Sequence, residues 1–222
     1  MSPGRARRSA TSRPQLDREL IVATAIDLAA TGATITFRNL GTALGADPTA
    51  VYRHFRDKDE LIGAVVDRLI LRTLAAVDAD ASWRDQLRDG AEHQIDLFAA
   101  HPSVGAGVST VVTGGPGELA AIDWILTQFQ RAGLPKDQAV RYYAAYSSYL
   151  LAAASALSIA RLQRDDGTTV SWVGDQRAVD AMRYPAVAAA ITELVALTDR
   201  DVYLMGIDVL LDAAEAAAAK AR

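Results

Sequence analysis

The sequence predicts an all-α protein with a small three-helix unit at its N-terminus and a larger helical body after it. Half of the 222 residues are hydrophobic, which supplies a sizeable core. Apolar residues recur three and four positions apart along most of the chain, the spacing of one helical face. Gly, Pro and capping Asp, Ser or Thr residues divide this pattern into segments of helical length. We expect the three-helix unit to span residues 15–60 and the body to span residues 61–222.

The first fourteen residues carry Arg5, Arg7, Arg8 and Arg13 among Gly, Ser and Pro. A segment of this composition has too little apolar surface to pack, so we expect a flexible basic arm over 1–14. Two interpretations stay open. The arm lies along the phosphates or in the minor groove of DNA, or it is a solubilising tail.

A first helix is expected over 15–31, ended by Gly32. Its task would be to support the two helices that follow. The predicted apolar face is formed by Leu16, Leu20 and Leu28, with Ile21 and Ala25 beside them.

The stretch from Thr36 to Phe55 predicts two short helices joined by a tight turn. Thr36 is a good N-cap for the first helix, and Gly45 supplies the permissive backbone that ends it. Asp47 then caps the second helix, and Pro48 suits its first position, where a missing N–H costs nothing. The inward faces are formed by apolar residues at helical spacing: Phe37, Leu40, Leu44, Val51 and Phe55.

Two helices joined by a glycine-containing turn form the pattern of the helix-turn-helix motif. The outward positions of the second helix carry donors, a cation and small groups, which suit a surface that enters a DNA major groove. The alternative is a three-helix packing unit that contacts no DNA and uses the same apolar residues as its core. The outward positions are Thr49, Ala50, Tyr52, Arg53 and His54.

A long third helix should begin after Asp57, because Asp57 and Glu60 have the spacing of a capping box. Extending to about Val77, it would be about 30 Å long, enough to connect the three-helix unit to a distant body. Lys58 lies in its first turn, where a cation is unfavourable for the helix dipole. We expect Lys58 to face a phosphate; the alternative is an exposed lysine without a task.

The segment from Thr36 to Leu61 resembles the DNA-binding domain of tetracycline-repressor-like (TetR/AcrR) transcriptional regulators. The similarity rests on Thr36-Phe37-Arg38, Leu40, Ala43-Leu44-Gly45, the run Ala50–Phe55, and Lys58 with Leu61. We expect a homodimer on double-stranded operator DNA, with Arg53 and Thr49 at base edges and Tyr52, His54, Thr36 and Lys58 mostly at phosphates. The full set of expected DNA contacts is Thr36, Arg38, Pro48, Thr49, Ala50, Tyr52, Arg53, His54 and Lys58.

The body is expected to contain further helices separated by Gly, Pro and polar breaks. Ser82 can cap a helix over 82–100, and Pro135 fits the start of a long helix over 136–164. Asp199 is expected to cap the last helix, whose Ala-rich end should fray. The remaining helices are expected over 102–113 (weakened by two glycines), 118–132, 176–182, 185–198 and 199–219, with a loop over 168–175.

Aromatic residues gather in the body between Phe98 and Tyr149. An apolar cavity with a few hydroxyls suits a small organic ligand; the alternative for each residue is core or a dimer interface. The Gly115–Leu119 pattern, the 129–134 turn and the 139–151 helix resemble the effector-binding domain of the same family. This resemblance implies a ligand cavity and a dimer formed by the last two long helices. The predicted pocket residues are Leu97, His101, Trp124, Gln128, Tyr142 and Tyr146.

Other chemistries find little support in the sequence. The chain has no cysteine, which excludes disulfides and thiol catalysis and fits a reducing cytoplasm. The Gly114–Gly117 turn lacks the Lys-Ser/Thr of a phosphate-binding loop. Asp89, His93 and Asp96 share a helical face, so a metal site is conceivable, but no remaining ligand is evident. We therefore expect no metal and no cofactor.

A membrane segment is not expected. Residues 142–160 carry no charge and approach the roughly twenty residues that a membrane span needs. The four Tyr and four Ser along them favour a core or subunit-interface helix instead.

The net charge of −4 is unevenly distributed. Residues 1–58 hold nine Lys/Arg against five Asp/Glu, whereas residues 59–222 hold fourteen against twenty-two. A basic end on an acidic body directs the favourable potential for DNA to one end. The sequence therefore predicts a cytoplasmic, ligand-responsive transcriptional regulator, a repressor rather than an enzyme. The alternatives are an activator of the same family, or a helical small-molecule-binding protein or enzyme without DNA binding.

Overall fold

The computed structural model describes residues 16–163 and 179–221. Within these ranges the chain forms ten α-helices and one 3-10 turn, as the sequence predicts for an all-α protein. The expected arm over 1–14 and the expected loop over 168–175 lie outside the described residues. The elements are α1 (Arg18–Ala30), α2 (Phe37–Leu44), α3 (Pro48–Val51), α4 (Lys58–Ala76), α5 (Trp83–Ala100), α6 (Pro102–Gly105), η1 (Val108–Thr110), α7 (Pro116–Arg131), α8 (Lys136–Leu162), α9 (Pro185–Ala196) and α10 (Asp199–Ala221).

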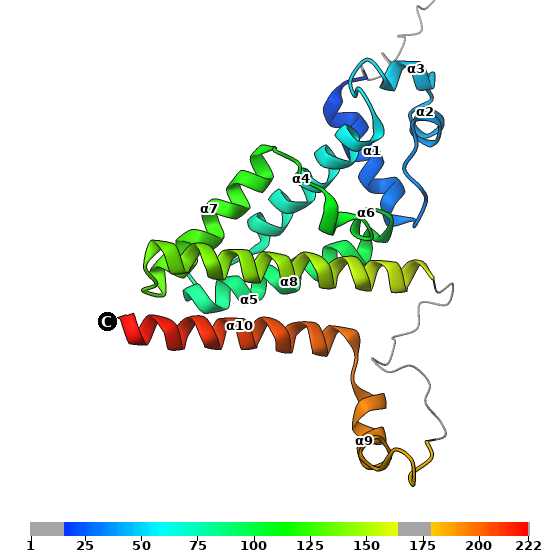
Figure 1. Ribbon diagram of the computed structural model, residues 1–222. Helices are drawn as coiled ribbons and strands as arrows, with labels where there is room; N and C mark the ends of the chain where they lie inside the picture. Colours follow the sequence, from blue (N-terminus) through cyan, green and yellow to red (C-terminus); the bar gives the residue numbers. More distant parts are fainter. Residues whose placement is uncertain (1–15, 164–178, 222) are drawn as a thin grey trace, which may run out of the picture.

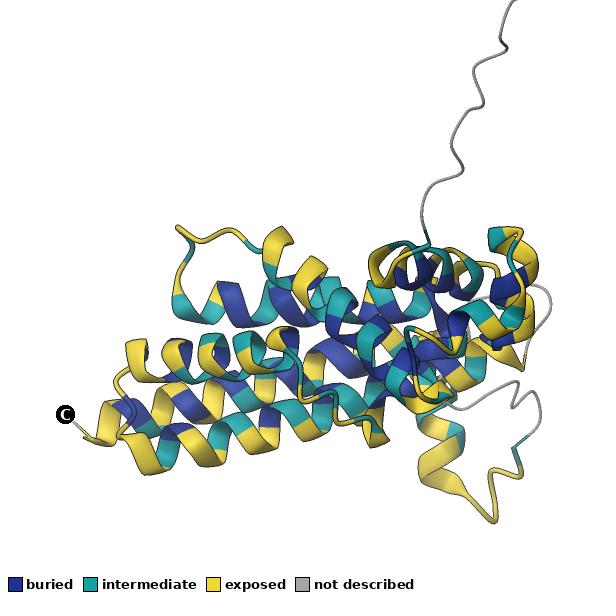
Figure 2. Ribbon diagram, turned by 90° about the horizontal axis from the view of Figure 1, so that it is seen from above, coloured by how far each residue is buried: buried dark blue, intermediate teal, exposed yellow. Residues whose placement is uncertain are grey.

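The helices form a small N-terminal head and a larger layered body (Figure 1). In the head, α1 packs against both the first half of α4 and α2, and α2 packs against α3; α4 then continues into the body. In the body, α8 packs against α5, α7 and α10, and α10 runs alongside α8 (Figures 1 and 2). Helix α9 projects away from this bundle and contains no buried residue. The long α4 is therefore the continuous element that links head and body.

Two hydrophobic clusters stabilise this arrangement. The head cluster surrounds Leu40, Phe55 and Leu61, and it extends into the body through Phe98 and Val104. The body cluster lies between α5, α7, α8 and α10 and is centred on fully buried aromatic and aliphatic side chains. Burial of each such side chain contributes about 1.5–3 kcal/mol relative to exposure. Because the head cluster continues into α5 and α6, head and body share one set of packing contacts.

Helix α1 begins later than expected and buries a different stripe. Asp17 caps it by accepting a hydrogen bond from the Leu20 N–H at 2.8 Å. Leu16, Leu20 and Leu28 are only partly buried, so the predicted face is wrong by about one position. Both stripes are apolar, and the head cluster selects the one that faces α2 and α4. The buried residues are Ile21, Val22, Ala25, Ile26 and Ala29.

The predicted helix over 102–113 is wrong. The chain there forms only the single turn α6 and the 3-10 turn η1, and Val111 is already extended. Gly105 serves packing: a Cβ atom on it would lie 2.1 Å from the Ser158 hydroxyl, so α6 can approach α8 this closely only because this residue is glycine. Of the two glycines that weaken the helical pattern, Gly105 thus allows close packing, whereas Gly107 has open space around it.

The predicted short helix over 176–182 is also not found in its described part. Residues 179–184 form a turn in which Asp180 accepts hydrogen bonds from the Met182 and Arg183 N–H groups at 3.0 and 3.2 Å. An Asp side chain that bonds backbone two and three residues ahead competes with helix formation. Helix α9 then starts at Pro185, close to the expected position.

The last helix begins at Asp199 as expected but differs in its cap and in its last residue. Thr198, rather than Asp199, makes the cap: its hydroxyl accepts from the Asp201 N–H at 3.1 Å, and Asp201 accepts from the Thr198 N–H at 3.2 Å. The helix extends to Ala221, two residues beyond the expected 219. Ala214 and Ala218 are buried against the rest of the body, so the Ala-rich end has a packing partner.

Candidate DNA-binding surface and ligand cavity

The helix-turn-helix geometry is set by local capping, as the sequence predicts. Thr36 caps α2 by accepting from the Asn39 N–H at 3.1 Å. Gly45 ends α2 with a φ of 60°, the left-handed conformation that glycine favours. Gly41 allows the turn to fold back tightly, because a Cβ there would lie 2.9 Å from the Ala46 carbonyl oxygen. Asp47 then caps α3 through the Thr49 N–H at 2.8 Å.

The second helix of the motif is shorter than the expected 47–55. Regular α3 spans Pro48–Val51, and residues 52–54 form a turn. Helical hydrogen bonding nevertheless continues, with the Phe55 N–H donating to the Val51 carbonyl at 3.1 Å. Val51 and Phe55 are buried. The intervening side chains of Tyr52 and Arg53 are therefore turned outward.

The predicted DNA contacts come from the N-cap and first turn of α2, from α3 and the turn that follows it, and from the first residue of α4, and each is exposed or half-buried. The side chains of Arg38, Arg53 and Lys58 make no hydrogen bond or ion pair among the described residues, so their charges are free to meet an anionic partner. Val51, inside the same segment, is fully buried and separates this surface from the core. The exposed members are Arg38, Thr49, Tyr52, Arg53 and Lys58, and the half-buried members are Thr36, Pro48, Ala50 and His54.

Two of these side chains already have defined partners. The Thr49 hydroxyl donates to the Asp47 carboxylate at 2.6 Å, and this hydrogen bond lowers the pKa of Asp47. Thr49 therefore presents its oxygen lone pair and its methyl group rather than its hydroxyl proton. Tyr52 packs edge-on against Phe37 with ring centroids 4.3 Å apart, yet 59% of its surface is exposed. The ring is thus fixed in place while its hydroxyl remains available.

Arg18 holds α3 onto α4, a role that sequence reasoning missed. Its guanidinium donates to the His54 carbonyl at 2.8 Å and to Glu60 at 2.9 Å, and it lies 4.1 Å from the centre of the Phe55 ring. Glu60 also accepts from the Arg56 N–H at 2.8 Å. No sequence pattern links Arg18 to residues about forty positions away. This cluster orients the outward side chains of α3 relative to α4.

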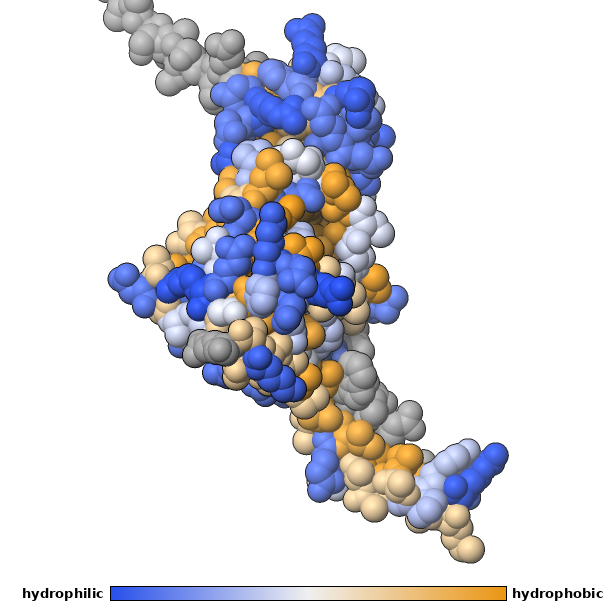
Figure 3. Space-filling model, turned by 60° about the vertical axis from the view of Figure 1, so that its left-hand side comes forward, coloured by the Kyte–Doolittle hydropathy of each residue, from blue (hydrophilic) through white to orange (hydrophobic). Residues whose placement is uncertain are grey.

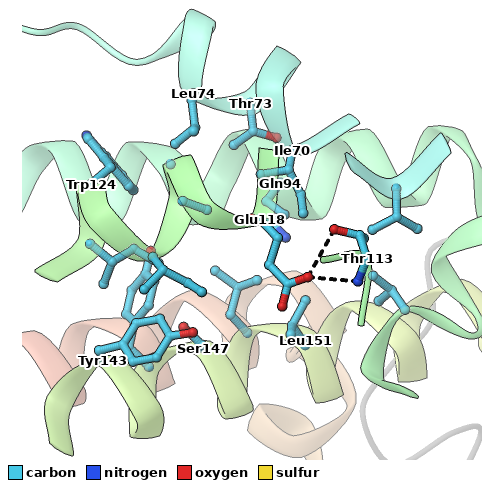
Figure 4. Close-up of a pocket in the computed structure, with 18 of the residues that line it drawn as sticks. Ile70, Thr73, Leu74, Gln94, Thr113, Glu118, Trp124, Tyr143, Ser147 and Leu151 are labelled. Atoms are coloured by element: carbon cyan, nitrogen blue, oxygen red, sulfur yellow. Dashed lines mark hydrogen bonds between the residues drawn. The ribbon is translucent and has the colours of Figure 1, made fainter. Parts of the chain in front are cut away.

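An apolar cavity of about 100 Å³ lies in the body between α4, α5, α7 and α8 (Figure 4). Of the six predicted pocket residues, Trp124 and Tyr146 line it. Tyr146 is 1% exposed and donates to the Leu87 carbonyl at 2.5 Å, and burial raises the pKa of its hydroxyl well above the ordinary value. Tyr143, one position along from the predicted Tyr142, faces the cavity as well.

The other four predicted pocket residues lie elsewhere. Tyr142 donates to the Ala213 carbonyl at 2.9 Å and so belongs to the contact between α8 and α10. The Gln128 side chain accepts from Arg131 at 3.0 Å. Leu97 packs against the head cluster, and His101 is buried at the end of α5 with Nδ1 2.7 Å from the Leu97 carbonyl oxygen. Helix α8 has neighbours on several sides, so periodicity alone cannot tell which tyrosine faces which helix.

A polar cluster at the start of α7 was also missed. Thr113 and Gly114 donate their N–H groups to one oxygen of Glu118, Oε2, at 2.7 and 2.8 Å. The Glu118 N–H in turn donates to Asp67 of α4 at 3.0 Å. Gly117 permits this approach, because a Cβ there would lie 2.3 Å from the Asp67 carbonyl oxygen. The only signal in the sequence was the Gly-rich turn before Glu118.

The conceivable metal ligands are occupied with other contacts. His93 Nδ1 lies 2.9 Å from the Asp89 carbonyl oxygen and 3.3 Å from its carboxylate. Asp96 pairs with Arg200 at 3.4 Å. Within the described ranges, no three His, Asp or Glu side chains are grouped so as to hold a metal ion. No helix in those ranges combines the length and hydropathy needed to cross a bilayer.

The fold and the outward-facing α3 define a helix-turn-helix regulator with a helical body. Residues 77–217 match the family described as "Tetracyclin repressor-like, C-terminal domain". The chain therefore belongs to the tetracycline-repressor-like (TetR) family and is a DNA-binding transcriptional regulator of that family. This finding agrees with the resemblance that the head residues carry.

Similar proteins of known sequence and structure support this assignment. An HTH-type transcriptional regulator of Saccharopolyspora erythraea is 27% identical over 83% of this chain and 78% of that protein. An HTH-type transcriptional repressor of Mycobacterium tuberculosis is 26% identical over 95% and 84%. A solved TetR regulator of Streptomyces coelicolor is 29% identical, with a TM-score of 0.74 over 91% of this chain and 99% of that one. ActR of Streptomyces coelicolor, solved in complex with actinorhodin, shares the fold at 19% identity and a TM-score of 0.73, over 92% and 99% of the two chains.

Proposed function

We propose that this protein is a dimeric repressor that binds a palindromic operator through α3 and is released by a small organic molecule in the body. The observation that carries the DNA part is the set of exposed, unpaired cations on the helix-turn-helix segment and the start of α4, with Arg53 two positions after the buried α3 residue Val51. Unpaired Lys and Arg side chains favour phosphate and base-edge contacts, since no internal partner must be displaced.

Arg53 is the proposed base reader, because an exposed guanidinium can donate two hydrogen bonds to guanine O6 and N7. Thr49 would contact a base edge through its methyl group or its oxygen, since its proton is held by Asp47. Lys58, Arg38 and the Tyr52 hydroxyl would hold phosphates and fix the register of the head. The remaining half-buried positions of the predicted set would contribute backbone and van der Waals contacts near the same groove: Thr36, Pro48, Ala50 and His54.

The proposed dimer forms through the C-terminal helices. Their outer faces expose apolar side chains that a monomer leaves in water, including Ile159 and Leu162 on α8 and Met205 and Val209 on α10, the last 60% exposed. The space-filling view shows apolar surface also along the projecting part of the chain that contains α9 (Figure 3). Exposed apolar patches of this kind mark protein–protein contacts. A two-fold arrangement would place two heads on successive major grooves, roughly 34–36 Å apart or a little more.

The cavity between α4, α5, α7 and α8 is the proposed effector site. It touches α4, which continues into the head, so a ligand there can favour a different position of the head. ActR, a member of the same fold with a bound small molecule, gives a parallel for a ligand in such a body. Binding of ligand and operator would be reciprocally coupled: bound DNA would lower the affinity for the ligand by the same factor by which bound ligand lowers the affinity for DNA. A non-enzymatic regulator of transcription would act in the cytoplasm, where the operator is.

The proposal is tested by selecting binding sites from random-sequence DNA with the full-length protein and footprinting the enriched sites. The expected result is an inverted repeat, with two half-sites that are protected together and a complex of two subunits in sedimentation. Enrichment of no sequence, or of a single unrepeated half-site bound by one subunit, would contradict the dimeric operator. If the operator lies where binding of the protein raises transcription, the protein is an activator and not a repressor.

A further inference from the structure

The residues that line the cavity include one negative charge and no positive charge. Its walls are aliphatic and aromatic, with Trp124 and Tyr143 on α7 and α8. Glu118 is the one charged side chain among the residues that line it, and no Lys, Arg or His lines it. A carboxylate beside apolar walls needs compensation, because charge is poorly solvated there, and Glu118 receives hydrogen bonds at one of its two oxygens, from the Thr113 and Gly114 N–H groups.

A second carboxylate increases the negative charge at this end of the cavity. Asp67, which is 7% exposed, lies with one oxygen 3.0 Å from the Thr113 hydroxyl, and Glu118 Oε2 is also 3.0 Å from that hydroxyl. Thr113 has one hydroxyl proton, so it can donate to only one of the two carboxylates at a time. Neither carboxylate has a cationic side chain within ion-pair distance in the described part of the chain.

Polar groups without a protein partner face the same space. All hydrogen bonds to the Glu118 carboxylate reach Oε2, and Figure 4 shows the other oxygen turned away from Thr113. The Ser147 hydroxyl oxygen is buried and has no hydrogen-bond partner among the described residues. Gln94 also lines the cavity, and its side-chain amide makes no hydrogen bond within the described ranges. For the Ser147 hydroxyl this calls for an explanation, because a buried polar group without a partner is rare in a folded protein.

We infer that the cavity selects a cationic ligand: an apolar or aromatic molecule that carries a protonated amine. The ammonium group would donate to the free oxygen of Glu118, and Ser147 and Gln94 would supply further polar contacts. The aromatic part would lie against Trp124 and Tyr143, whose ring faces also attract cations. An anionic ligand of the same size would be repelled by Glu118 and Asp67 without any cation to compensate. This inference rests on the proposed effector site and names its ligand class.

The test compares three probes that share one aromatic body and differ in charge: 4-phenylbutylamine, 4-phenylbutan-1-ol and 4-phenylbutyrate. Alkyl amines are protonated at pH 7, since their pKa lies near that of lysine, about 10.4. Binding to the full-length protein is measured by calorimetry at fixed ionic strength. The expected affinity is highest for the amine, lower for the alcohol and lowest for the carboxylate. The amine should bind at least about tenfold more tightly than the alcohol, the gain typical of a charge-assisted hydrogen bond.

The variant E118Q keeps an oxygen that can accept from Thr113 and Gly114 but removes the charge. It should lower the affinity for the amine by about tenfold while leaving the affinity for the alcohol within about threefold. The matched control is D123N, because Asp123 is exposed on the same helix and does not line the cavity. D123N should leave all three affinities unchanged. Circular dichroism checks that each variant is folded. If E118Q is not folded, D67N takes its place as the variant that removes a negative charge.

Each outcome decides the inference. If the alcohol or the carboxylate binds as tightly as the amine, the cavity is a ligand site but its charge selectivity is overturned, and the proposed function stands. Equal loss of amine affinity in E118Q and D123N would also overturn it, because the effect would then be general electrostatics. If the folded protein binds none of the probes at millimolar concentration, the inference fails. Selection of operator sites from random DNA tests the proposed DNA binding independently of the ligand.

Discussion

The substitution Arg53→Ala tests the base-reading role of α3 most sharply. Arg53 is exposed and makes no side-chain hydrogen bond or ion pair among the described residues, so its loss should change the free energy of unfolding by no more than about 0.5 kcal/mol. A bidentate contact with guanine contributes about 1–3 kcal/mol of discrimination. R53A should therefore weaken operator binding roughly five- to 150-fold and relax the preference at one base pair in each half-site.

The assay is a titration of the selected operator and of single-base variants of each half-site position, with thermal unfolding measured in parallel. The matched control is Arg72→Ala, because Arg72 is exposed on α4 and also lacks an ion-pair partner in the described structure. R72A removes the same charge from a position outside the proposed surface and should leave base preference intact. If R53A and R72A lose the same affinity and neither changes base preference, Arg53 is not a reader.

Three further predictions concern the phosphate contact, the head cap and the junction of α4 with α7. Lys58→Ala should weaken binding to all DNA sequences alike and lower the slope of log affinity against log salt by about 1; a sequence-selective loss would contradict the phosphate role. Asp57 accepts hydrogen bonds from the first turn of α4, and these lower the pKa of its carboxyl below 3.8. The carboxylate of Asp57 therefore stabilises the fold above that pH, and this stabilisation is lost as the pH falls through the lowered pKa. Thermal unfolding between pH 5 and 2 should accordingly depend less on pH in Asp57→Asn, and equal slopes would refute this. Gly117→Ala should destabilise by about 1–3 kcal/mol, because its Cβ would lie 2.3 Å from the Asp67 backbone oxygen, whereas Gly107→Ala, with open space around it, should have little effect in the same denaturant titration.

Local features of the head could be predicted from the sequence. Thr36, Asp47 and Asp57 cap their helices through hydrogen bonds to residues two or three positions ahead. Gly45 takes the left-handed conformation that its place after α2 requires. Such interactions depend on neighbours in the chain, so residue type and spacing identify them.

The polar cluster at the cavity could not be predicted in this way. Asp67 and Glu118 are fifty-one positions apart, and their contact depends on how α7 packs across α4. The choice between Tyr142 and Tyr143 likewise depends on which helix lies on each side of α8. Periodicity locates a helical face, but it does not say which neighbour covers the face when several helices do.

The first helix shows a related difficulty. Helix α1 has two adjacent apolar stripes. The stripe that contains Ile21 and Ala25 is the buried one, because it faces α2 and α4. The division of the chain near residue 60 stays a prediction. The head cluster runs on into α5 and α6 through Phe98 and Val104, so head and body share one continuous contact.

The central claim is that the head binds one DNA sequence specifically. The most direct measurement is fluorescence anisotropy of the purified protein with the DNA upstream of its own gene and with a scrambled control, across a salt series. We predict a preference of roughly 10³-fold or more for one sequence together with a steep salt dependence. If the upstream DNA is not the operator, the site obtained by selection takes its place in the same titration. Absence of binding to either DNA at low salt would contradict the claim and favour a helical ligand-binding protein without a DNA partner.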